Sequence, residues 1–436
     1  MVEDSDVRIL CDPWLVDGEY YGSWYHYPPL EFHPEEFNDV DFIYISHVHP
    51  DHFSRKTLLH LDKDIPVIIH KFESGFLKNN IEKLGFKVME LRHNYRAHLK
   101  NGLNIRILSA DNCDPRLCSK FFGCGSFEPK LGLTSLDTMC VIDNGEHNVV
   151  NTNDCPYDLS YSALQIIKGN YPDIDFLLVG YSGAGPYPQC FNMNVKEIEV
   201  ACKNKKQEFL AQAEMYINVL KPKFYMPFAG RYTLAGKLNI MNDNRGLTEL
   251  EEAASYLSQS DAIDQKGQKC VILNQNAYFD LETGRCSKTY TAINLSRKRQ
   301  YIIEVLSKIK YDYESDPIPS IEDLKGLIAA SYLRFESRRR EIGFSSDTIA
   351  LIELSSDLFV ALAFNGDGYK FVSRKECECI EKYIKISVDK RLLKRILLGP
   401  IQAHWNNAEI GSHIAYERKP NIFERGAYHC INFFHC

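Results

Sequence analysis

Short apolar runs alternate with amphipathic stretches through the first half of the chain. The apolar runs are rich in valine and isoleucine and are bounded by turn residues, which is typical of buried β-strands. They cover residues 41–46, 66–70, 103–110, 138–143, 148–152 and 175–182. Residues 54–62 and 73–85 carry apolar side chains at helical spacing, and the second stretch ends in a glycine. This alternation of strands and helices predicts a layered α/β sandwich.

The pattern changes beyond about residue 240. The predicted elements around and after this point are a helix at about 205–220, a strand with its loop at 221–230, a helix at 247–257, a β-hairpin around 269–289 and a polar linker at 311–323. A helix, strands, a second helix and a mixed tail follow. A chain of 436 residues is long enough for more than one hydrophobic core. We predict a domain of residues 1–240, a connecting helix and hairpin segment of residues 241–320 and a C-terminal α+β domain of residues 321–436.

The first apolar run leads directly into the sequence HVHPDH, which is rich in metal-ligand side chains. Its candidate ligands are His47, His49, Asp51 and His52. Two imidazoles two positions apart at a strand end can hold one cation, and the aspartate and histidine that follow can hold a second. Two adjacent metals would activate a water between them and bind an oxyanion. The alternative is a histidine-rich surface loop, which this density of ligands after a β-run disfavours.

Composition and charge exclude several classes of partner and cofactor site. The net charge of −7 argues against a broad nucleic-acid interface, which requires a basic face. No apolar run approaches the length of a membrane span, and the acidic start MVEDSDVRIL does not have the pattern of a signal peptide. The 14 cysteines contain no CxxC pair, so the spacing of zinc ribbons and iron–sulfur clusters is missing. We expect a cytoplasmic protein with reduced cysteines.

The motif resembles the metallo-β-lactamase superfold, an αββα sandwich. HVHPDH, the upstream DPWL and the strand NVVNT that leads to Asp154 carry this resemblance over roughly residues 8–235. It implies that Asp154 is the carboxylate that bridges the two metals. Within the superfold, the sequence is most similar to the CMP-N-acetylneuraminate hydroxylase group, through DPWL, IYISHVHPDH, NTNDC, GYSGAGPYP and MPFAGRY.

The chain departs from the family pattern at three places. Where the superfold has its third metal-site histidine, after the run at 103–110, this chain has Asp111 or Asn112, and Asp111 could ligate through oxygen. Where the last histidine ligand would fall, it has Ala229 and Gly230. The β-hairpin that usually precedes DPWL, and the Rieske iron–sulfur domain of the hydroxylases, are expected to be absent, so the predicted sandwich is N-terminally trimmed. An oxygen-rich site moves the expected pair of divalent metals from zinc toward iron or manganese.

These features predict a metal-dependent enzyme acting on a small polar molecule, phosphate- or sugar-bearing by resemblance. We expect a metallo-hydrolase in which Asp51 or Asp154 orients the metal-activated water and takes its proton. The first alternative is an iron-dependent monooxygenase that receives electrons from a separate protein. The second is a binding module whose site has lost its turnover.

Two loops are candidates for substrate contacts. The glycine-rich stretch GYSGAGPYP places Tyr181 and Ser182 after a predicted strand, where glycines allow a ligand to approach the backbone. The aromatic stretch after DPWL supplies Trp24 and His26. The alternatives are a tight loop for the first and an aromatic cluster packed against the sandwich for the second. The C-terminal residues 383–418 loosely resemble the sterol-carrier fold, which implies an apolar tunnel for a lipid-like ligand or a lid over the metals.

Overall fold

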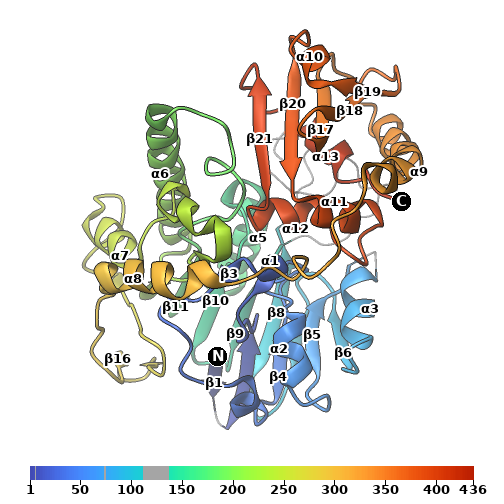
Figure 1. The fold of residues 1–436 in the computed structure, drawn as a ribbon. Helices are drawn as coiled ribbons and strands as arrows, with labels where there is room; N and C mark the ends of the chain where they lie inside the picture. The colour runs from blue at the N-terminus through green and yellow to red at the C-terminus, as the bar shows by residue number, and fades with distance from the viewer. Residues whose placement is uncertain (5, 73–74, 111–136) are drawn as a thin grey trace.

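The computed structural model describes residues 1–4, 6–72, 75–110 and 137–436. Its first sheet has the strand order β1-β2-β4-β5-β6 (Figure 1). The strands are β1 (Val2–Asp4), β2 (Val7–Cys11), β4 (Phe42–Tyr44), β5 (Val67–His70) and β6 (Val88–Leu91). All neighbours pair in parallel except β1 and β2, which form an antiparallel hairpin. The expectation that no hairpin precedes Asp12 is therefore wrong, because the few residues before it are enough for two short paired strands.

The second sheet has the order β14-β12-β11-β10-β9-β8-β7. Its strands are β7 (Arg96–His98), β8 (Asn104–Ser109), β9 (Thr138–Asp143), β10 (Asn148–Asn151), β11 (Phe176–Val179), β12 (Phe224–Pro227) and β14 (Lys269–Cys270). The strands β10, β11, β12 and β14 are parallel, so their carboxyl ends lie at one edge. The predicted hairpin at 269–289 is divided, because β14 joins this sheet while β15 (Phe279–Asp280) and β16 (Arg285–Cys286) form a small ribbon.

Helices cover the outer face of each sheet. The helices α2 (Arg55–His60) and α3 (Phe76–Glu82) pack on the first sheet around a core that includes Leu58, Leu77 and Ile81. The helices on the second sheet are α5 (Tyr157–Asn170), α6 (Val195–Leu220) and α7 (Leu250–Gln259). Between the sheets lies an apolar layer to which Ile9 and Ile105 contribute. The chain thus has the αββα sandwich of the metallo-β-lactamase fold.

A second α+β unit follows the sandwich. Its sheet has the order β19-β18-β17-β20-β21, from strands β17 (Ile349–Ser355), β18 (Leu358–Ala363), β19 (Tyr369–Ser373), β20 (Tyr383–Val388) and β21 (Ile414–Lys419). Its helices are α9 (Ile321–Glu341), α10 (Arg374–Cys377), α11 (Lys390–Leu397), α12 (Trp405–Ile410) and α13 (Arg425–Ile431). We call residues 321–436 the C-terminal module. The domain division at residues 240 and 320 and the sterol-carrier resemblance stay predictions.

The C-terminal module packs against the loops of the sandwich. Its core cluster contains Tyr20, Trp24 and Tyr232 from the first half of the chain, and helix α12 contacts α1 (Glu19–Gly22) (Figure 1). Tyr311 and Tyr313 of the predicted linker are buried in the same core. The remaining elements are β3 (Trp24–Tyr25), β13 (Thr233–Leu234), α8 (Leu295–Glu304) and the 3-10 helices at Pro34–Phe37, Gly236–Asn244 and Leu306–Lys308. Within the described residues, no helix has the length and apolar character needed to cross a membrane.

Candidate metal centre

The sequence HVHPDH follows strand β4, where the carboxyl ends of the parallel strands of the first sheet meet. Strand β10 of the second sheet delivers Asp154 a few residues beyond its own carboxyl end. Strands β8 and β9 pair antiparallel with Ser109 opposite Thr138, which puts Asp137 at the end of β8. Both sheets therefore contribute side chains to one edge of the sandwich.

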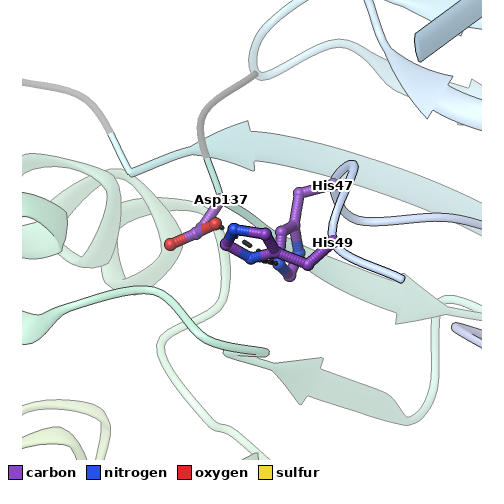
Figure 2. Close-up of side chains that lie close together, drawn as sticks. All are labelled: His47, His49 and Asp137. Atoms are coloured by element: carbon purple, nitrogen blue, oxygen red, sulfur yellow. Dashed lines mark hydrogen bonds and ion pairs between the residues drawn. The ribbon is translucent and has the colours of Figure 1, made fainter. Parts of the chain in front are cut away.

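One group of ligand atoms comes from His47, His49 and Asp137, whose side chains point toward one another (Figure 2). His47 Nε2 lies 2.8 Å from His49 Nδ1 and 3.6 Å from Asp137 Oδ1. The ligand atoms of the group lie within 4.8 Å of one another. Since metal–nitrogen bonds are about 2.0–2.1 Å long, these separations suit donors around a single cation.

A second group shares His47 and lies beside the first. It consists of His47, His52 and Asp154, again with ligand atoms within 4.8 Å of one another. His52 Nε2 is 3.4 Å from Asp154 Oδ2 and 3.4 Å from Asp51 Oδ2. Asp51 is held from its other oxygen by the hydroxyl of Tyr20, which donates a hydrogen bond to Oδ1. His47 has one ring nitrogen available, so it can serve only one of the two groups. With His47 in the first group, His52, Asp51 and Asp154 remain for a second cation position beside it.

The ring nitrogens that face away from these positions have partners that fix the tautomers. Asp12 Oδ2 accepts from Ser46 Oγ at 2.6 Å and lies 2.9 Å from His52 Nδ1. Ser46 Oγ in turn lies 2.9 Å from His47 Nδ1. With Nδ1 of both rings protonated and donating, the Nε2 lone pairs of His47 and His52 are free for a metal. Asp12 thus orients two ligands at once.

Charge and burial reinforce this arrangement. Burial, followed by the neighbouring imidazoles, lowers the pKa of His47 well below its usual value. Burial would also lower the pKa of His52, but the carboxylates of Asp154, Asp51 and Asp12 raise it well above. Burial favours a neutral Asp51, but the charge of His52 lowers the pKa of that carboxyl to about 2. The acidic groups thus stabilise a positive charge at His52 Nε2, where a metal cation would replace a proton.

The donor set fits divalent metals. Three imidazoles and the three carboxylates of Asp51, Asp137 and Asp154 supply nitrogen and oxygen ligands, without a thiolate in either group. Such ligands suit zinc, iron and manganese, and the high oxygen share favours iron and manganese relative to a histidine-only site. A metal bound here would supply Lewis acidity, and iron would also supply redox chemistry.

The structure brings His47, His49, Asp51 and His52 of the motif together with Asp154, which the resemblance indicated. Their roles as metal ligands stay predictions. Asp111 lies outside the described residues. Sequence reasoning missed Asp137, Asp12 and Tyr20 as parts of this centre. The signal for Asp12 was its position in DPWL directly after a strand that runs parallel to β4. The signal for Asp137 was its place immediately before the predicted strand at 138–143.

The four predicted substrate contacts lie in different surroundings. Trp24 is 2% exposed and stacks on Tyr232 with ring centroids 3.5 Å apart, which agrees with the alternative of a packed aromatic cluster. His26 pairs with Asp17 at 2.8 Å. Tyr181 is 2% exposed in the core beneath α6, whereas Ser182 is partly exposed. A role for any of them in substrate binding stays a prediction.

Relatives of this chain carry hydroxylase and iron–sulfur names. A putative Rieske 2Fe-2S iron-sulfur protein of Mycobacterium tuberculosis is 28% identical over 291 residues, which are 64% of this chain and 52% of the relative. The cytidine monophosphate-N-acetylneuraminic acid hydroxylase of Danio rerio is 25% identical over 253 residues, 52% of this chain and 36% of the enzyme. The chain therefore spans about half or less of the length of these relatives. No family model matches the chain.

Solved structures with partial similarity include a hydrolase and a diiron hydroxylase. The isothiocyanate hydrolase from Delia radicum gut bacteria has a TM-score of 0.41 and 12% identity, and the match covers 62% of this chain and 92% of the hydrolase. CmlA, a diiron β-hydroxylase from Streptomyces venezuelae, has a TM-score of 0.37 and 16% identity, over 61% of this chain and 49% of CmlA.

The architecture, the candidate ligands and the sequence relatives point the same way. Two facing sheets with outer helices carry a histidine- and aspartate-rich centre at the strand ends, and the sequence relatives match over more than half of the chain. The chain has the metallo-β-lactamase fold and is similar in sequence to the cytidine monophosphate-N-acetylneuraminic acid hydroxylases.

Proposed function

We propose that this protein is an iron-dependent hydroxylase with a dinuclear centre, reduced by a separate electron donor. The observation that carries the proposal is the composition of the first ligand group, in which His47, His49 and Asp137 supply two histidines and one aspartate. Two histidines and one carboxylate with open positions are the ligand set of non-haem iron oxygenases. This proposal ranks the oxygenase above the hydrolase that the sequence alone favours.

The side chains around the centre suit this use. Asp154 is 42% exposed and Asp137 is 26% exposed, whereas the side chain of His47 is 1% exposed. A substrate can therefore approach from the side of these two aspartates, while His47 and His52 are shielded from water. When bound, iron would supply the redox chemistry. Asp154 is placed to accept a proton from a substrate group, and Tyr20 keeps Asp51 oriented.

The sequence relatives support the need for an electron donor. Some are hydroxylases by name and others are named as Rieske 2Fe-2S proteins. The sequence of this chain contains no CxxC pair for an iron–sulfur site of its own. We propose that a reduced iron–sulfur protein of the same cytoplasmic compartment supplies the electrons, and that the substrate is a small polar molecule.

Hydrolysis is the second candidate, and the exposed carboxylate of Asp154 next to His52 favours it. A hydrolase needs only water, and Asp154 or Asp51 would orient that water and take its proton. A binding module without turnover is the third candidate. It would retain the fold but bind no metal or show neither reaction.

The deciding experiment measures metal content and reactivity in the same preparations. Protein from media replete in iron, zinc and manganese is analysed for metal per chain, beside a His49→Ala, Asp51→Ala double variant. The iron form is then reduced chemically and exposed to oxygen, while its absorption spectrum and oxygen uptake are recorded. Model esters and phosphodiesters serve as hydrolysis substrates.

We expect about two irons per chain in the wild type, loss of iron in the double variant, and oxygen uptake by the reduced protein. Two zinc ions with ester or phosphodiester cleavage and no reaction of the iron form with oxygen would replace the hydroxylase by the hydrolase. Absence of bound metal in the wild type would contradict both enzymes and support the binding module.

A further inference from the structure

The side chain of Asn406 brings the C-terminal module to the candidate metal centre. Asn406, in the first turn of helix α12, lies with Nδ2 3.3 Å from Nε2 of His49. The two residues are 357 positions apart in sequence. His49 Nδ1 faces His47 Nε2 at 2.8 Å, so the nitrogen in contact with Asn406 is the one turned away from the metal position.

This contact completes a pattern among the three histidines. Ser46 holds His47 through Nδ1, and Asp12 holds His52 through Nδ1. Asn406 takes the corresponding place for His49, at Nε2. A histidine that binds a metal through one ring nitrogen carries its proton on the other, which needs an acceptor. A carboxamide offers its oxygen after a half turn of the amide, so Asn406 can accept that proton.

Helix α12 is fixed by bonds on several sides. The backbone N–H of His404, at its N-cap, donates to the hydroxyl of Tyr21 at 2.7 Å. Trp405 is fully buried and its indole N–H donates to the carbonyl of Phe434 at 2.9 Å. The backbone N–H of Asn406 itself bonds to the His404 ring at 3.1 Å. Asn406 is therefore presented to His49 from a rigid support.

The same module also supports the segment that holds Asp51. His413 Nε2 lies 2.8 Å from the carbonyl oxygen of Tyr20. Tyr20 has a φ of 50°, a left-handed conformation that is costly for a tyrosine and needs surrounding structure to maintain it. The hydroxyl of Tyr20 then donates to Asp51. A ligand on each side of the centre is thus steadied by residues of the C-terminal module.

We propose that Asn406 is a positioning residue for the ligand His49, so that the C-terminal module completes the metal centre of the sandwich. The proposal rests on the metal centre of the proposed function but not on whether that centre hydroxylates or hydrolyses. Without Asn406, the His49 ring is free to rotate and to take the tautomer with its proton on Nδ1. A protonated Nδ1, the nitrogen that faces the metal position, cannot bind a metal.

The test compares Asn406→Leu and Asn406→Asp with the wild type, and uses Asn365→Leu in the exposed turn between β18 and β19 as the matched control. Metal affinity for zinc and cobalt(II) is measured by competition with a chromogenic chelator, and the visible spectrum of the cobalt form reports the ligands. Thermal unfolding of the metal-free proteins shows whether each variant is folded.

We expect Asn406→Leu to weaken binding at one of the two positions by about 10- to 100-fold and to change the cobalt spectrum. Asn406→Asp keeps an acceptor and should bind within about threefold of the wild type. The proposal is overturned if Asn406→Leu binds like the wild type, or if Asn406→Asp loses as much affinity as Asn406→Leu. If Asn406→Leu does not fold, affinity of Asn406→Asp more than tenfold below the wild type overturns it. A wild type that binds no metal would instead contradict the metal centre itself.

Discussion

Replacement of Asp12 by asparagine should disable two metal ligands without removing either. Asp12 Oδ1 accepts the N–H of Ser46 at 2.7 Å, and Oδ2 accepts from Ser46 Oγ and from His52 Nδ1. Asparagine can keep the first bond with its oxygen, but it then puts an NH2 group where Oδ2 was. Ser46 Oγ and His52 Nδ1 would both have to become acceptors.

The consequence is a change of tautomer on two rings. His52 that accepts at Nδ1 carries its proton on Nε2, which faces Asp51 and Asp154. When Ser46 Oγ accepts a hydrogen bond from the asparagine amide, its own hydroxyl proton points toward His47 Nδ1. His47 Nδ1 must then accept that hydrogen bond, so the His47 ring carries its proton on Nε2 as well. The loss of one such partner weakens metal binding by about 10- to 100-fold. With two ligands affected, we expect about 100-fold weaker binding, or about 2.8 kcal/mol.

The assay is the chelator competition, with Asp12→Ala as the comparison. Alanine removes the acceptor but introduces no donor, so both rings can still take the productive tautomer, and we expect a loss of only about tenfold. Glu35→Gln is the control, because Glu35 Oε1 lies 2.6 Å from His60 Nδ1 in an exposed pair of the same chemistry. Equal binding by Asp12→Asn and the wild type, or weaker binding by Asp12→Ala than by Asp12→Asn, would refute the tautomer argument.

Three further changes test other parts of the structure. Tyr20→Phe removes the hydroxyl that donates to Asp51 and should weaken metal binding by about tenfold in the same competition assay. Burial raises the pKa of Glu409 to about 8, so stability falls as pH rises between about 4.5 and 8. Glu409→Gln should therefore be more stable than the wild type above pH 8, by up to about 5 kcal/mol in urea unfolding. Gly183→Ala places a Cβ 1.8 Å from the ring of Phe209 and should cost about 1–3 kcal/mol in the same unfolding assay, with partial recovery in a Gly183→Ala, Phe209→Leu double variant.

The sign of the Glu409 prediction follows from which state keeps the proton. The folded protein holds a proton on Glu409 up to about pH 8, whereas the unfolded chain releases it near its ordinary value of 4.5. Glutamine cannot ionise, so the variant should lose this slope, while the exposed Glu381→Gln should retain it. Equal pH profiles of Glu409→Gln and the wild type would contradict the argument.

The other two variants can also contradict their predictions. Unchanged stability of Gly183→Ala would show that α6 can move away from the loop. Wild-type metal affinity of Tyr20→Phe would show that Asp51 needs no partner.

The sandwich and the clustering of the motif's histidines could be predicted from the sequence because both depend on local patterns. The strand at 138–143 matches β9, and the strand at 148–152 matches β10 to within one residue. The helix predicted at 205–220 begins earlier, at Val195, where Asn194 and Glu197 form a capping box. That start was hidden because the first turns of α6 are mostly exposed and even Val195 and Val200 lie on the surface, so their apolar residues do not form the regular stripe of a buried helix face.

Asp137, Tyr20 and Asn406 could not be assigned from local patterns. The pairing of β9 with β8 places Asp137 at the centre. The register of two strands that are separated by a long segment cannot be predicted from the sequence of either strand alone. Tyr20 lies in a segment with left-handed backbone conformation, and tyrosines in the sequence EYYG give no indication of that conformation. Asn406 depends on how the C-terminal module packs on the sandwich, a contact set by the shared core around Trp24 and Tyr232.

The charge of the centre gives a reason for its many aspartates. Two divalent cations carry four positive charges, and the carboxylates of Asp51, Asp137 and Asp154 supply three negative charges. The loaded centre would then keep about one positive charge beside a protein of net charge −7. Compared with a neutral ligand, the carboxylate of Asp137 lowers this charge by one, which would favour a more oxidised metal pair. The same lower charge would make a metal-bound water less acidic, so the carboxylates suit the proposed hydroxylase better than a hydrolase that depends on ionised water.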